Sequence, residues 1–101
     1  MNIAIETLQA DRHRLAEAGG SLVSRHRLLA MIASDEKELG TDRFVLRYFF
    51  SSGEPRQILA LETTVPESDP EYASLTPLFP AASWSEREAC DLFGVRPVGH
   101  P

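Results

Sequence analysis

The order of elements that this sequence predicts mixes strands and helices in one domain: a strand, a short helix, a second strand, a hairpin and a closing helix. Three observations carry this prediction. Aromatic and branched side chains fill residues 43–51, a second alternating run follows a turn and ends at Val65, and apolar side chains recur at helical spacing before Gly94. At 101 residues the chain fits one domain with a core of its own.

The amino-terminal part predicts a strand, a helix and a second strand. Residues 2–8 alternate and carry β-branched side chains, which favours an edge or half-buried strand. Asp11 is the expected N-cap of a helix over 11–18, and Gly19-Gly20 is expected to end that helix in left-handed backbone. The uninterrupted apolar run over 28–33 indicates a strand covered on both faces, with a helix as the open alternative.

The hairpin is the most clearly predicted element. Its first strand directs four apolar side chains to one side of the pleat: Phe44, Leu46, Tyr48 and Phe50. A turn at Ser52-Gly53-Glu54-Pro55 leads into the second strand. There, one side of the pleat carries Leu59, Leu61, Thr63 and Val65, and the other carries Ile58, Ala60, Glu62 and Thr64. The two strands are therefore expected to pair.

Prolines shape the segment between the hairpin and the closing helix. Pro66 and Pro70 cannot donate to a sheet, so they indicate a loop. Pro77 and Pro80 disfavour helical backbone in the residues before them. We therefore expect an extended chain up to about Ala82.

The closing helix is predicted from its two ends. Ser83 and Glu86 have the Ser-x-x-Glu spacing of a capping box, and Ser85 with Glu88 offers the same spacing in a shifted register. Gly94 stands where a glycine ends a helix of roughly ten residues.

This helix separates charged from apolar side chains. Ala89, Leu92 and Phe93 project to one side with Glu86 near them, and Arg87, Glu88 and Asp91 project to the other. Arg87 and Asp91 are four residues apart and can pair, but an exposed pair contributes only about 0.3 to 0.5 kcal/mol. The charged side is therefore interpreted either as an ordinary solvated face or as a surface that a partner covers.

Composition narrows the classes of function. A net charge of −5 argues against a nucleic-acid surface, and the basic clusters at 12–14 and 25–27 are interpreted as solvated faces. One cysteine and three scattered histidines form no ligand set for a metal, and a lone cysteine indicates a reducing compartment. No stretch approaches the roughly 20 apolar residues that span a bilayer.

Two catalytic interpretations of the closing helix are disfavoured. As an acid and base pair, Glu86 and Glu88 would point about 160° apart, so they could not flank one bond. As a nucleophile, Cys90 would need a base, and only His100 lies in the same segment, beyond a glycine and a proline. A small buried thiol is the favoured interpretation of Cys90.

The closing segment contains a long motif, Glu86-Arg87-Glu88-x-x-Asp91-Leu92-Phe93-Gly94, followed by Gly99-His100-Pro101. With this motif the segment resembles the 30-kilodalton subunit family of respiratory complex I. The preceding segment is similar to the same family and holds Ser74-Leu75-Thr76-Pro77 and Trp84. Residues 65–77 are especially similar to the equivalent module of membrane-bound nickel-iron hydrogenases related to complex I, including those of formate hydrogenlyase.

The resemblance implies an α+β fold: a mainly antiparallel mixed sheet of about four strands with helices packed on it, in a single domain over residues 1–101. It implies a non-catalytic structural subunit without a cofactor of its own, cytoplasmic and peripheral to the membrane through its complex. Its expected partners are the large catalytic subunit, hydrogenase-like or of the 49-kilodalton type, and the iron-sulfur subunit; these would hold iron-sulfur clusters and, in a hydrogenase, nickel-iron. The family motif carries over to Glu86, Arg87, Glu88, Asp91, Phe93 and His100, which are assigned to fold integrity and partner docking.

Several alternatives stay open. The home complex is either an NADH:quinone oxidoreductase or a hydrogenase, with the hydrogenase slightly favoured. A stand-alone homo-oligomeric adaptor that uses an exposed sheet edge is a different class of function, and a small enzyme using the acidic helix 84–93 is a third. Members of the family continue past the position of Pro101, so either a trimmed domain or a compact variant is expected.

Overall fold

A four-stranded mixed sheet forms the centre of the molecule, in a computed structural model that describes residues 5–53 and 57–101. Its strands are β1 (Ile5–Gln9), β2 (His26–Asp35), β3 (Arg43–Ser52) and β4 (Ile58–Pro66), in the spatial order β1-β4-β3-β2. β3 is antiparallel to both β2 and β4, and β1 is parallel to β4. The predicted α+β fold with a mainly antiparallel sheet of four strands is confirmed.

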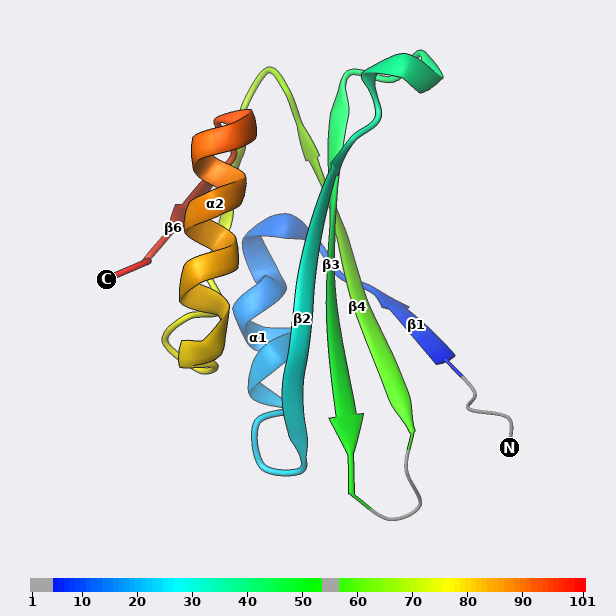
Figure 1. Cartoon of the computed structure of the whole chain (residues 1–101), viewed down its shortest axis with the longest axis vertical. Helices are drawn as coiled ribbons and strands as arrows, with labels where there is room; N and C mark the ends of the chain where they lie inside the picture. The colour runs from blue at the N-terminus through cyan, green and yellow to red at the C-terminus, as the bar shows by residue number, and fades with distance from the viewer. Residues whose placement is uncertain (1–4, 54–56) are drawn as a thin grey trace.

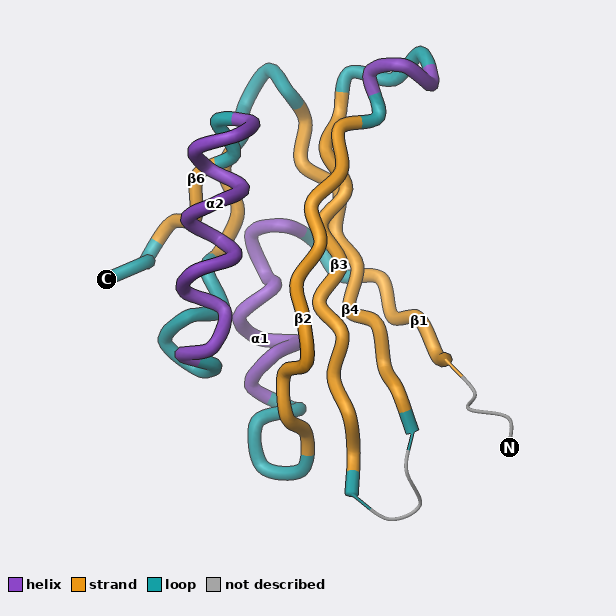
Figure 2. The backbone as a smooth tube through the Cα atoms, viewed as in Figure 1, coloured by secondary structure: helices purple, strands orange, loops and turns teal. Residues whose placement is uncertain are grey.

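Two helices lie on the same side of this sheet, as Figure 1 shows. They are α1 (Leu15–Gly20) and α2 (Ser83–Phe93). The described residues also form three short 3-10 helices: η1 (Arg12–Arg14) before α1, η2 (Lys37–Leu39) between β2 and β3, and η3 (Pro80–Ala82) before α2. A second sheet of two parallel strands, β5 (Glu71–Ala73) and β6 (Arg96–Val98), lies beside α2 (Figure 2). The sequence did not predict this small sheet.

The hairpin of β3 and β4 builds the core as predicted. Phe44 lies opposite Val65 and Tyr48 lies opposite Leu61, so the two apolar sides of the strands coincide. All eight side chains on this side are buried: Phe44, Leu46, Tyr48, Phe50, Leu59, Leu61, Thr63 and Val65. The helices cover this side of the sheet. Of the predicted turn, Glu54 and Pro55 lie outside the described residues.

Of the two edge strands, β1 agrees with its prediction and β2 differs in part. β2 is a strand, as expected, but it is not covered on both faces, because Leu29 and Ile32 are about half exposed, at 47% and 53%. Both helices lie on one side of the sheet, and the apolar run alone could not show that its other side lacks a cover. β1 begins at Ile5 and all five of its residues are exposed, in agreement with an edge strand; residues 2–4 lie outside the described ranges.

The helix predicted over 11–18 is divided in the structure and ends differently. Asp11 is the N-cap of the 3-10 helix η1, where its carboxylate accepts a hydrogen bond of 3.0 Å from the backbone amide of His13. The α-helix itself begins only at Leu15, and no side chain caps it at Arg14. Gly19-Gly20 does not end the helix in left-handed backbone, because both glycines belong to α1 and neither has a positive φ. A Cβ at Gly19 would lie only 2.8 Å from Cδ2 of the buried Leu75. Gly19 therefore permits close packing rather than a turn.

The basic cluster at 12–14 is not a uniformly solvated face. Arg12 is mostly buried, with a side-chain exposure of 16%, and donates to the carbonyls of Asp69 and Glu71 at 2.6 and 2.9 Å. It also pairs with the carboxylate of Asp69 at 2.9 Å. In contrast, Arg14 is exposed and pairs with Glu17. Arg12 joins the start of the first helix to the loop before β5.

The chain before α2 is not extended as the prolines predicted. The amides of Leu78 and Phe79 both donate to the carbonyl of Leu75, at 3.0 and 2.8 Å, and close a tight turn. Pro80 then opens η3. A proline disfavours helix in the residue before it but suits the first position of a helical turn, because its φ is already fixed near the helical value.

Candidate functional site

The start of α2 corrects the predicted capping box. The N-cap position is Ala82, in helical backbone, and no side chain caps the helix there. The amide of Ala82 instead donates to the carbonyl of Phe79 at 2.8 Å, so η3 runs directly into α2. Because the preceding turn continues into the helix, neither Ser83 nor Glu86 is needed as a cap.

Glu86 is instead the centre of a buried hydrogen-bond network. Its side chain is 0% exposed. Its carboxylate accepts four hydrogen bonds, from the Tyr48 hydroxyl at 2.5 Å, the Ser74 hydroxyl at 2.6 Å, the Thr76 hydroxyl at 2.7 Å and the Leu75 amide at 2.9 Å. A buried carboxylate is tolerable only when its oxygens are paired in this way. Glu86 therefore connects α2 to β3 and to the loop after β5.

Burial raises the pKa of two tyrosines, Tyr48 in this network and Tyr72. Burial, with the neighbouring Tyr72 and the charge of Glu86, raises the pKa of Tyr48 well above its ordinary value. Burial and the charge of Glu86 also raise the pKa of Tyr72. Both hydroxyls therefore hold their protons well beyond the ordinary range of tyrosine.

Three further residues of the closing motif, Phe93, Gly94 and His100, end α2 or hold it in place. Gly94 ends the helix in left-handed backbone, with φ 76°, and its amide donates to the carbonyl of Cys90 at 2.8 Å, as predicted. The chain then reverses through β6, and His100 Nε2 lies 3.2 Å from the hydroxyl of Ser83 at the opposite end of the helix. Phe93 contacts Phe44 of β3, with ring centres 5.8 Å apart. His100 and Phe93 thus hold α2 in place.

The opposite side of α2 is exposed and carries three charged side chains. Trp84, Arg87, Glu88 and Asp91 line a cavity of about 290 Å³. Within the described ranges none of the three charged side chains forms an ion pair, so Arg87 and Asp91 do not pair although their spacing would allow it. Trp84 is 74% exposed. The structure therefore divides the predicted site: Glu86 faces the core, while Arg87, Glu88 and Asp91 share an outer face.

The residues that sequence reasoning missed are the partners of Glu86. Tyr48 lies 38 positions away, and the hydroxyls of Ser74 and Thr76 come from a turn that was expected to be extended. The available signal was the position of Glu86 on the apolar side of its helix, which demands a partner in the core.

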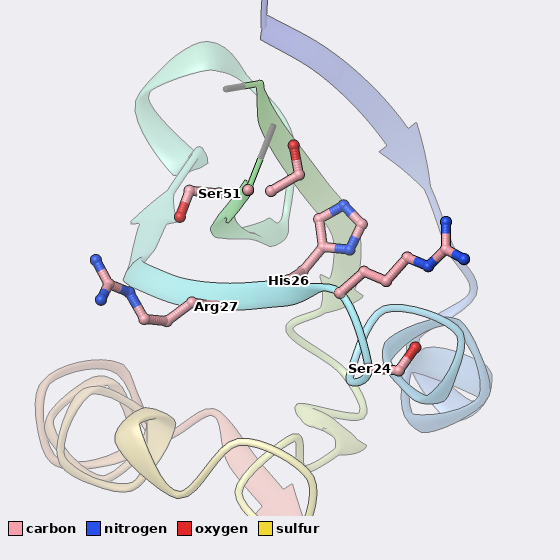
Figure 3. Close-up of a pocket in the computed structure, with 7 residues that line it drawn as sticks. Ser24, His26, Arg27 and Ser51 are labelled. Atoms are coloured by element: carbon pink, nitrogen blue, oxygen red, sulfur yellow. The ribbon is translucent and has the colours of Figure 1, made fainter. Parts of the chain in front are cut away.

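A second cavity, of about 450 Å³, lies at one end of the sheet and is lined by Ser24, Arg25, His26, Arg27, Ser51, Ser52 and Gly53. In Figure 3 the Arg27 side chain points away from the His26 ring, so the two do not converge on one point.

The acidic helix does not assemble an acid and base pair. Glu86 is enclosed and saturated by its four donors, whereas Glu88 is exposed on the outer face. In the described part of the chain, no three His, Cys, Asp or Glu side chains cluster to hold a metal. Over the same residues, no helix has the length and apolar character to cross a membrane.

Comparison with known proteins identifies a family and relatives that are named as subunits of oxidoreductases or of formate hydrogenlyase. The family described as "Respiratory-chain NADH dehydrogenase, 30 Kd subunit" matches residues 8–101. An NADH-quinone oxidoreductase subunit of Nocardioides sp. is 38% identical over 64 residues, which are 63% of this chain and 25% of that protein. Formate hydrogenlyase subunit 5 of Escherichia coli is 35% identical over 75 residues, 73% of this chain and 13% of that protein. The chain thus matches a quarter or less of the length of these two relatives.

Solved structures share the fold. A trypsin-resistant fragment of Nqo5 superposes with a TM-score of 0.85 and 24% identity, covering 100% of this chain and 84% of the fragment. A chain of an archaeal membrane-bound sulfane sulfur reductase superposes with a TM-score of 0.84 and 18% identity, covering 99% of this chain and 60% of its own. With the family match extending from the first strand through the closing motif, this chain belongs to the family of the 30-kilodalton subunit of respiratory-chain NADH dehydrogenase.

Proposed function

We propose that this chain is a non-catalytic docking domain of a membrane-associated oxidoreductase complex, either an NADH:quinone oxidoreductase or a related nickel-iron hydrogenase. It braces the large catalytic subunit and the iron-sulfur subunit, and it binds no cofactor itself. The iron-sulfur clusters, and nickel-iron in a hydrogenase, belong to those partners. The domain lies on the cytoplasmic side and reaches the membrane only through its complex.

The observation that carries this proposal is the contrast between the two sides of α2. The inner side is fixed by Glu86, Phe93 and His100, so the helix has a defined position. The outer side presents an exposed tryptophan and three charges that have no ion-pair partner among the described residues. Trp and Arg are the residues that most often dominate the energy of a protein interface. A rigid helix with such a face is suited to docking.

Between the two possible complexes, the hydrogenase is favoured slightly. The match with formate hydrogenlyase subunit 5 extends over 73% of this chain, compared with 63% for the Nocardioides protein. The same relatives supply the support for a multi-subunit home, because both are named as subunits. The gene that follows this one would distinguish the two homes by encoding either a nickel-binding or a quinone-reductase large subunit.

Co-purification from the native host tests the proposal. The tagged full chain should bring down a large oxidoreductase subunit and an iron-sulfur subunit. A triple variant, Arg87→Ala, Glu88→Ala and Asp91→Ala, should lose them, since each truncated interface anchor costs about 2 kcal/mol or more.

A matched triple variant controls for charge and side-chain number. Arg14→Ala, Glu17→Ala and Asp42→Ala removes the same three residue types from exposed positions elsewhere. This control should retain both partners. A wild-type chain that never brings down a large subunit would refute the proposal, and a stable homodimer in light scattering without partners would favour the adaptor.

A further inference from the structure

The pocket on the outer side of α2 has the composition to bind one class of partner group. Arg87 and Glu88 lie three and four residues after Trp84, and Asp91 lies four and three residues after them, so the four side chains share a face. We propose, on the basis of the docking role above, that this pocket receives the guanidinium of an arginine side chain from a partner subunit.

The charge of the pocket selects a cation. Glu88 and Asp91 supply two negative charges and Arg87 supplies one positive charge, which leaves the pocket with a net negative charge. Neither carboxylate has an ion-pair partner in the described part of the chain. In contrast, the exposed Glu17 and the half-exposed Glu71 each pair with an arginine. An entering carboxylate would be repelled by two like charges.

The indole of Trp84 selects arginine among the cations. A guanidinium is planar, so it can stack on the face of the indole and direct its N–H edge at a carboxylate one turn away. A lysine ammonium can be attracted to either group but cannot stack, and it lacks the fork that matches a carboxylate. Arg87 provides the opposing charge at the same rim, which keeps a second cation from entering beside the first.

The chain provides its own spectroscopic reporter, because Trp84 is its only tryptophan. We expect the fluorescence of Trp84 to change saturably when the chain is titrated with N-acetyl-arginine amide. N-acetyl-citrulline amide has the same shape without the charge and, at matched ionic strength, should produce no saturable change. Equal responses to the two compounds would overturn the proposal.

Single substitutions test which charges form the site. Glu88→Gln and Asp91→Asn should each weaken the binding of N-acetyl-arginine amide by about two- to fivefold, and Arg87→Gln should tighten it by about twofold, as for exposed ion pairs. Glu6→Gln removes the same charge from exposed β1 and should have no effect. An unchanged affinity in both carboxylate variants would also overturn the proposal.

Photo-cross-linking in the assembled complex separates this inference from the docking role. Leu92 is 68% exposed on α2 and does not line the pocket, so Leu92→benzoylphenylalanine places a reactive group beside it. A cross-linked partner peptide that contains an arginine next to the linked residue supports the inference. A partner peptide without one overturns the inference and leaves the docking role standing. Failure of the complex to co-purify overturns both.

Discussion

The hydroxyl of Tyr48 donates a 2.5 Å hydrogen bond to Oε2 of Glu86, which joins the middle of β3 to the first turn of α2. The helix therefore does not rest on apolar packing alone. Its rotation is specified, because only one orientation brings the carboxylate to the Tyr48, Ser74 and Thr76 hydroxyls. The same rotation directs Arg87 and Asp91 outward. The buried network thus determines which side chains of α2 a partner can meet.

Glu86→Gln should destabilise the fold by about 2 to 3 kcal/mol, because the amide nitrogen replaces an acceptor that faces buried donors. Tyr48→Phe removes one charge-assisted hydrogen bond and should cost about 1.5 to 3 kcal/mol. Urea unfolding followed by circular dichroism measures both. Glu88→Gln makes the same chemical change on the exposed side of α2 and should stay within about 0.5 kcal/mol of wild type. Equal losses in the two glutamine variants would contradict the network.

Stability should fall as the pH rises above about 10, where tyrosines of an unfolded chain ionise. Both tyrosines of this chain have a raised pKa in the folded state, so above that pH the folded chain binds more protons than the unfolded chain. The slope of unfolding free energy against pH is then negative. Lys37, whose pKa is raised by its hydrogen bond and pairing with Glu67, adds to the same slope.

Ultraviolet absorbance separates the tyrosines from Lys37. Tyrosinate absorbance should remain low while the chain is folded and should rise together with the loss of helical circular dichroism. Tyr48→Phe should flatten the alkaline slope, because one of the protons held by the folded state is removed. A tyrosine that ionises near pH 10 with the fold intact would be inconsistent with the buried network.

The sequence predicted the elements that have a local pattern of side chains. It did not predict the elements whose structure depends on contacts with residues distant in the sequence. Alternation in β3 and β4 was sufficient, because both strands have one buried side that repeats every second residue. Gly94 was predicted correctly, because a helix end needs a left-handed residue at that point. β6 was missed because three residues that include Pro97 carry no strand pattern.

The sequence predicted which side of α2 each charged residue occupies, but not the partners of Glu86. Helical projection placed Glu86 on the apolar side and Arg87, Glu88 and Asp91 on the other, and the structure has that division. The predicted capping role of Glu86 was wrong: the Ser-x-x-Glu spacing favoured a cap, but no side chain caps α2. Its real partners include Tyr48, which only the packing of α2 on the sheet brings near.

Arg12 and Arg14 look alike in the sequence and should differ in their contribution to stability. Arg12→Ala leaves two backbone carbonyls and the Asp69 carboxylate without their donor, and we expect a loss of about 1 to 3 kcal/mol. Arg14→Ala breaks only an exposed pair with Glu17 and should change stability by less than about 0.5 kcal/mol. Urea unfolding of the two variants measures the difference, and similar values would show that Arg12 is not a tertiary link.

Gly19 and Gly20 offer a matched test of close packing, because both are helical and only Gly19 is confined. Gly19→Ala places a Cβ against Leu75 and should cost about 1 to 3 kcal/mol through overpacking of the core. A Cβ at Gly20 meets nothing within 4 Å, so Gly20→Ala should stabilise the chain by about 0.4 to 1 kcal/mol by restricting the unfolded state. Thermal and urea unfolding measure the two opposite shifts. If both alanines stabilise the chain, α1 does not pack against Leu75 as closely as the structure shows.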